Sequence, residues 1–175
     1  NLRNNGRTYV PYLLTCILST AMFYVICSLS LNPDLDMMLG GGYMRTLLQM
    51  GTWIVGFFVI IFLFYTNSFL MKRRKKEFGV FNILGMEKRH ISKVIAYETL
   101  FTALVSLLAG ISLGIVLERL LYYALGAMMV GGGALTFNIS VEGIRTTLIL
   151  FAIIHLLIFL SSRWQIRLAN PIQLL

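Results

Sequence analysis

Residues 72–101 read KRRKKEFGVFNILGMEKRHISKVIAYETLF, which joins one long apolar window to the start of the next. The stretch opens with five basic residues, continues with a short apolar segment punctuated by glycine, and returns to basic residues before the next window. Positive residues near the ends of membrane spans mark the cytoplasmic side. Topology needs only a few such charges and no apolar side chains among them. We therefore expect a cytoplasmic loop with a contact surface.

The composition is that of an integral membrane protein. The 175 residues are 58% hydrophobic and 13% charged, against about 25% charged in a soluble domain. A membrane-spanning helix needs about 20 apolar residues, and four apolar windows contain no charge: 8–33, 46–71, 99–117 and 146–162. A fifth uncharged window, 120–141, is rich in glycine, so we expect its first turns to finish the third helix and the rest to form a loop. The sequence predicts an all-α membrane fold with four spans and one cytoplasmic loop. The spans are expected at about 10–31, 46–71, 97–124 and 145–162, and the loop at 72–96.

The basic residues are distributed unevenly along the chain. Twelve of the 15 lie before the first window, between the second and third, or after the fourth. Both termini are therefore predicted to be cytoplasmic. Nucleic acid is not expected as a partner, because no soluble module is left to carry the contact. We expect the first basic run to set this topology and to contact lipid headgroups; it comprises Lys72, Arg73, Arg74, Lys75 and Lys76.

The apolar part of the loop has helical spacing. Phe78, Phe81 and Leu84 recur at intervals of three, which places them on one face of about two helical turns. Gly85 is suited to end such a turn. So short an amphipathic segment cannot span the membrane. Two interpretations remain open from the residues: an elbow packed on its own bundle, or a surface that contacts a partner.

The third predicted span carries a stripe of small residues, four apart: Thr102, Ser106, Gly110 and Gly114. Membrane helices pack closely through such stripes, and Gly110 with Gly114 forms a GxxxG motif. The stripe therefore predicts a helix–helix seam, within this chain or with a segment beyond it.

The ionisable residues in and near the spans suggest structural roles. His155 stands alone in the fourth span, so we expect a neutral side chain hydrogen-bonded to a neighbouring helix rather than a functional site. Glu98 is expected to form an ion pair with the basic loop rather than to relay protons. Asp34 and Asp36 are too few oxygens for a calcium site. The sequence suggests no catalytic set, no cofactor site and no metal site.

Several motifs together resemble a known family. They are KKEFG at 75–79, LGM at 84–86 and KRHI at 88–91, with NLRNN at 1–5, YVPY at 9–12 and ANPIQLL at 169–175. They are similar to the FtsX-like permeases of ABC transporters, particularly those of the bacitracin- and lantibiotic-resistance type in Gram-positive bacteria. Such permeases are much longer, with further spans and a large extracellular domain. We therefore expect residues 1–175 to be one FtsX-like transmembrane unit, the N-terminal part of a longer permease.

The resemblance implies a mechanism and a set of partners. The loop would dock on a separate ABC ATPase, which would bind ATP and Mg²⁺, while this chain would be a non-catalytic permease subunit of the bacterial cell membrane. Further partners would be the lipid bilayer, the rest of the permease or a second copy, and a sensor histidine kinase. Related permeases act on antimicrobial peptides or transmit force across the membrane. The docking positions carried over are Glu77, Phe78, Gly79, Phe81, Leu84, Gly85 and Met86.

Two other functions remain alternatives. A small channel or secondary transporter would need polar residues along a path inside the spans, and the spans contain few. A membrane adaptor that recruits a cytoplasmic partner would use the same docking loop but would not move with nucleotide.

Overall fold

The computed structural model describes residues 6–37, 40–83, 88–128 and 139–168. These form four long helices and one short 3-10 helix: α1 (Gly6–Ser30), η1 (Pro33–Met37), α2 (Gly41–Ile83), α3 (Lys88–Met128) and α4 (Val141–Leu168). Each of the four long helices contains one of the four charge-free apolar windows almost entirely, and all four are long and apolar enough to cross a membrane. The prediction of an all-helical fold with four candidate spans is confirmed.

The helices extend beyond the predicted spans. α2 continues twelve residues past 71, and α3 begins nine residues before 97. Lysine, arginine and glutamate are good helix formers, so the charges that end the apolar window do not end the helix. The apolar segment around Phe78 and Phe81 is consequently the last part of α2 rather than a separate short helix.

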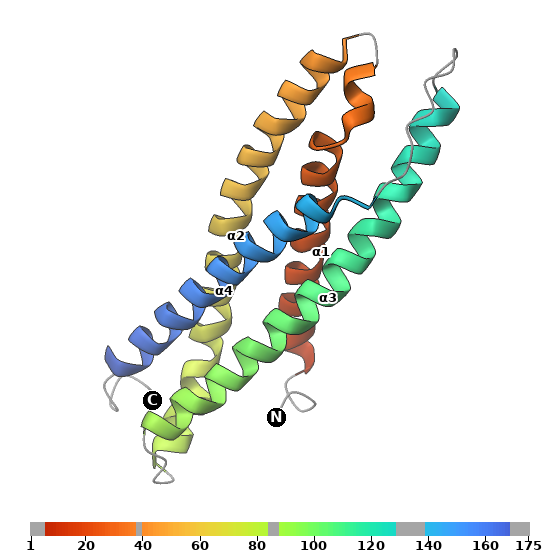
Figure 1. Cartoon of the computed structure of the whole chain (residues 1–175). Helices are drawn as coiled ribbons and strands as arrows, with labels where there is room; N and C mark the ends of the chain where they lie inside the picture. The colour runs from red at the N-terminus through yellow and green to blue at the C-terminus, as the bar shows by residue number, and fades with distance from the viewer. Residues whose placement is uncertain (1–5, 38–39, 84–87, 129–138, 169–175) are drawn as a thin grey trace.

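Helix α1 is the centre of the bundle. In its apolar window 56% of the residues are buried, compared with 17% in α2, 22% in α3 and 33% in α4. It lies between α2 and α3, and α4 crosses in front of it (Figure 1). α2 and α3 lie apart over most of their length and approach each other only where α2 ends and α3 begins. The beginning of α1 and the end of α4 lie toward this same end (Figure 1).

Two different kinds of packing hold α1 in place. Against α2 and α4 it uses aromatic and aliphatic side chains, including a T-shaped contact between Phe23 and Phe151 with ring centroids 6.0 Å apart. Against α3 it packs at close range: a Cβ atom added to Gly110 would lie 2.5 Å from Cβ of Thr20. Large apolar side chains elsewhere face outward, such as Trp53, which is 82% exposed. An outward apolar surface of this kind suits a lipid environment.

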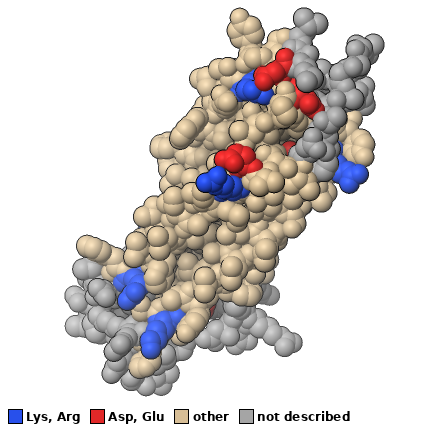
Figure 2. Space-filling model, in the orientation of Figure 1, with Lys and Arg blue, Asp and Glu red and all other residues tan. Residues whose placement is uncertain are grey.

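On the face shown in Figure 2, the acidic side chains lie in the upper half, where basic side chains lie near them, and further basic side chains lie toward the lower end. Near the upper end, η1 follows α1, and Arg45 of α2 pairs with Asp36 of η1 at 2.7 Å. We call this end, where α1 finishes, the outer end, and the opposite end the inner end, following the charge-based prediction of topology.

Candidate functional site

A buried ion pair joins α2 to α3 at the inner end of the bundle. The guanidinium of Arg74 meets the carboxylate of Glu98 in a bidentate arrangement: Nη1 contacts Oε2, and Nη2 donates to Oε1 at 3.1 Å. The two side chains are only 7% and 10% exposed. An ion pair between Glu98 and the basic loop was predicted, and the structure identifies Arg74 as the partner and places the pair inside the bundle.

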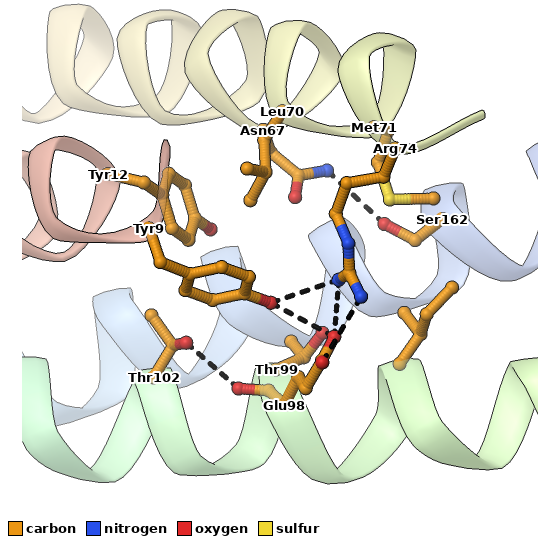
Figure 3. Close-up of a pocket in the computed structure, with 11 residues that line it drawn as sticks. Tyr9, Tyr12, Asn67, Leu70, Met71, Arg74, Glu98, Thr99, Thr102 and Ser162 are labelled. Carbon is orange, nitrogen blue, oxygen red and sulfur yellow. Dashed lines mark hydrogen bonds and ion pairs between the residues drawn. The ribbon is translucent and has the colours of Figure 1, made fainter. Parts of the chain in front are cut away.

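Tyr9 of α1 completes this cluster. Its hydroxyl donates to Glu98 Oε2 at 3.0 Å and accepts from Arg74 Nη1 at 3.1 Å, and the guanidinium lies 5.5 Å from the centre of its ring. Figure 3 shows the three side chains converging from three helices. We call Tyr9, Arg74 and Glu98 the inner node.

The inner node has a chemical reason to bring its two charges together. Taking a single charge out of water costs several kcal/mol, and mutual attraction offsets this cost only when the geometry is good and the remaining polar atoms are bonded. The two-point contact between guanidinium and carboxylate gives that geometry. The node therefore holds a net charge of zero in a position where either charge alone would be strongly unfavourable.

A small polar pocket surrounds the node, and all four helices line it. Next to the node, Asn67 of α2 donates to Ser162 of α4 at 3.2 Å, so α4 is joined to the same region (Figure 3). The pocket lining consists of Tyr9, Tyr12, Asn67, Leu70, Met71, Arg74, Ile95, Glu98, Thr99, Thr102 and Ser162. Through these contacts the inner end of every helix meets at one place.

Four of the seven predicted docking positions lie beyond the node, in the last turns of α2. The backbone of Glu77, Phe78, Gly79 and Phe81 belongs to α2, although the directions of these side chains are outside the described part of the chain. The other three positions, Leu84, Gly85 and Met86, fall in the segment 84–87 that the structure does not describe. Docking at these positions stays a prediction.

The basic run divides into side chains that face out and one that faces in. Lys72 and Arg73 are exposed, and Arg73 lies over the ring of Phe69 at 4.9 Å. Arg74 was expected to contact lipid headgroups, but its side chain points inward to Glu98. The side chains of Lys75 and Lys76 are outside the described part, and lipid contact of the run stays a prediction.

The small-residue stripe of α3 lies on its buried side. Thr102 and Ser106 are buried, and Gly110 and Gly114 face α1, where an added Cβ would meet Thr20 and Tyr24 at 2.5 and 2.6 Å. At the same level as Ser106, His155 of α4 lies 3.3 Å from the serine hydroxyl, as expected for a histidine hydrogen-bonded to a neighbouring helix.

Sequence reasoning missed that the stripe continues at both ends. One step of four residues before Thr102 is Glu98, and one step after Gly114 is Glu118, which is fully buried and accepts from Ser28 of α1 at 2.5 Å. The same spacing that predicts a seam would have placed both carboxylates on it.

The comparisons with known proteins agree with this architecture. Residues 49–171 match the family described as FtsX-like permease C-terminal. The "Uncharacterized ABC transporter permease YvcS" of Bacillus subtilis (strain 168) is 29% identical over 177 residues, covering all of this chain and 27% of that protein.

Two bacitracin export permeases are also similar. The protein BceB of Halalkalibacterium halodurans and that of Bacillus subtilis (strain 168) are each 26% identical over 162 residues, covering 93% of this chain and 25% of each relative. This chain thus spans about a quarter of the length of the relatives that it matches. The family match covers well over half of the chain, and the four candidate spans agree with it: this chain belongs to the FtsX-like permease family of membrane transport proteins.

Proposed function

We propose that this chain is the transmembrane unit through which an ABC permease couples ATP hydrolysis by a separate ATPase to movement across the membrane. One observation carries the proposal: α2 and α3 continue past their apolar spans as an extension of the bundle. The candidate span of α2 ends at Arg74 and that of α3 begins at Ser92, while the helices themselves reach Ile83 and Lys88. A helical extension carrying basic and apolar residues offers a docking surface for a cytoplasmic protein.

The chemistry of the docking positions supports an ATPase partner. Phe78 and Phe81 have the spacing of one helical face, and apolar aromatic anchors in a pocket supply most of the energy of a typical protein interface. Basic residues on either side would favour encounter with an acidic surface. Membership of the FtsX-like permease family supports an ABC ATPase as this partner, which would supply the sites for ATP and Mg²⁺.

The substrate class is proposed from the relatives. Two of them are named bacitracin export permeases, so we propose that the whole permease acts in resistance to antimicrobial peptides by exporting or releasing them. The rest of the permease or a second copy would complete the assembly. A sensor histidine kinase is a further proposed partner, which would link transport to detection of the peptide.

A pull-down of the full-length permease in gentle detergent, with bound subunits identified by mass spectrometry, tests the proposal. Phe81→Glu places a charge in the apolar contact and is expected to abolish recovery of the ATPase. Asn82→Glu adds the same charge at the neighbouring polar position, and the ATPase should still be recovered. Wild-type permease that is folded and inserted but binds no ATP-binding subunit would favour a channel instead.

The adaptor alternative is separated by movement. An adaptor would recruit its partner through the same loop, but the arrangement of its helices would not change when nucleotide binds. Spectroscopic distances measured across the bundle with and without a trapped nucleotide therefore distinguish the two functions.

A further inference from the structure

We propose that the inner node is the clamp that makes the α2–α3 extension move as one body with α1, so that Arg74, Glu98 and Tyr9 are positioning residues for the ATP-driven step. This inference rests on the proposed function. Neither docking of the loop on the ATPase nor the topology of the spans requires a buried polar cluster, so the proposal gives the node a function of its own.

The node lies where the extension begins, at nearly the same distance from the end of α2 and from the start of α3. Arg74 is nine residues before the end of α2 at Ile83, and Glu98 is ten residues after the start of α3 at Lys88. At about 1.5 Å per residue, the arms from the node to these ends are roughly 14 and 15 Å long. A force applied at the far end of two arms of nearly equal length acts on both helices through the node that joins them.

Outside this region α2 and α3 have little to hold them together. Their mutual contact is the least extensive of any pair of long helices, and α1 lies between them over the rest of the bundle (Figure 1). Without the node, the two arms could slide or splay independently when a partner pushes on the tip. The bidentate Arg74–Glu98 contact fixes both the separation and the relative angle of the two helices.

Tyr9 connects the Arg74–Glu98 pair to the helix that reaches the outer end. Its hydroxyl bonds to both charged partners, so a displacement of the pair also displaces the beginning of α1. Farther along, α1 and α3 are packed so closely at Gly110 and Gly114 that an added Cβ would lie within 3 Å of α1 side chains. A seam without free space transmits displacement instead of absorbing it.

An ion pair is not needed at this place for stability alone. Well-packed apolar residues of similar volume often replace a buried ion pair with neutral or stabilising effect, whereas removal of one partner is strongly destabilising. An apolar replacement of both partners can therefore keep the bundle stable while it removes the ion pair, which distinguishes a positioning role from a merely structural one. The double variant Arg74→Met/Glu98→Leu fills the site with apolar side chains and leaves no unpaired charge, so it is expected to fold.

The experiment uses the full-length permease with its ATPase, after replacement of native cysteines. Spin labels are attached at two exposed positions near the outer end, Leu47 of α2 and Leu120 of α3. The distance between the two labels is measured by double electron–electron resonance with and without vanadate-trapped nucleotide. The control variant Glu142→Leu/Arg145→Met removes the same pair of charges from an exposed contact within one helix.

We expect a nucleotide-dependent change in the distance distribution for the wild type and the control, and loss of that change in the double variant. The ATPase should co-purify with all three. A double variant that binds the ATPase and shows the full wild-type change would overturn the inference but leave the proposed function intact. A wild type that binds no ATPase would overturn the proposed function itself. Tyr9→Phe, which removes only the hydroxyl, gives a second reading: an unreduced change would contradict the link to α1.

Discussion

A single methyl group added to the α1–α3 seam should separate the two helices. In Gly110→Ala the new Cβ would lie 2.5 Å from Cβ of Thr20, 2.8 Å from its Cγ2 and 3.0 Å from the backbone oxygen of Ile17. Optimal carbon–carbon separation is about 3.5–4.0 Å, so the helices would have to move apart by about 1 Å. Rotation of the Thr20 side chain cannot relieve the contact, because Cβ is fixed to the backbone.

The magnitude follows from a matched control. Overpacking of a closely packed site costs about 1–3 kcal/mol, but replacing glycine by alanine within a helix also favours the helix by up to about 1 kcal/mol. Gly51→Ala in α2 gains the same helix preference, and its Cβ would meet only Ile26 Cγ2 at 3.9 Å, an ordinary contact. The difference between the two variants therefore isolates the overpacking cost, expected at about 1–3 kcal/mol.

Unfolding of the purified permease in mixed micelles, driven by increasing sodium dodecyl sulfate and followed by circular dichroism, measures both variants. Gly110→Ala should unfold at a lower detergent fraction than Gly51→Ala. If the two variants have equal unfolding free energies, or if Gly110→Ala is the more stable, then α1 and α3 are not packed as closely as the structure shows and the reasoning is refuted.

Three further predictions concern the ends of the bundle. Glu98→Ala leaves the buried guanidinium of Arg74 without its carboxylate and should lower the free energy of unfolding by about 3–5 kcal/mol, whereas Arg74→Met/Glu98→Leu should recover most of this loss. The same unfolding assay measures both variants, and equal losses would contradict the pairing. Ser28→Ala removes the hydroxyl that donates to the buried carboxylate of Glu118 at the outer end and should lower the free energy of unfolding by about 1–3 kcal/mol. An unchanged free energy of unfolding would count against that hydrogen bond. A membrane-impermeant maleimide should label Tyr43→Cys in intact cells but Lys93→Cys only after permeabilisation, and the reverse pattern would invert the predicted topology.

The number and type of the helices could be predicted from the sequence because lipid imposes a simple requirement. Every backbone polar group in the bilayer must be bonded internally, and a span must be long and apolar. The four charge-free windows meet this requirement. The helix ends could not be predicted in the same way. The basic residues that follow Met71 end the apolar window, but the helix continues through them to Ile83.

The identity of the buried ion pair was harder to predict than its existence. Eight basic residues lie between the second and third windows, and any of several could have met Glu98. The buried side of α2 includes Leu63, Asn67 and Leu70, and the same helical phase continued by four residues reaches Arg74. In a run of consecutive charged residues on a helix, the side chain that points inward is therefore the one in line with the buried residues of the preceding turns.

The contact with α1 could not be derived from the sequence at all. A tyrosine at the start of a span, such as Tyr9, is usually found at the membrane–water interface. Its position between Arg74 and Glu98 depends on how α1 is rotated and how deeply it lies between α2 and α3. Those are properties of the assembled bundle, and no local pattern specifies them.

The central place of α1 also has a consequence for biogenesis. Within this unit α1 is synthesised before the three helices that pack on it, and chains generally fold from the N-terminal side during translation. Each later helix thus emerges next to a surface that is already in the bilayer, and α3 finds its close-packed partner without waiting for the rest of the chain. Substitutions on the buried side of α1 should accordingly lower the amount of protein that survives quality control, before any effect on transport can be measured.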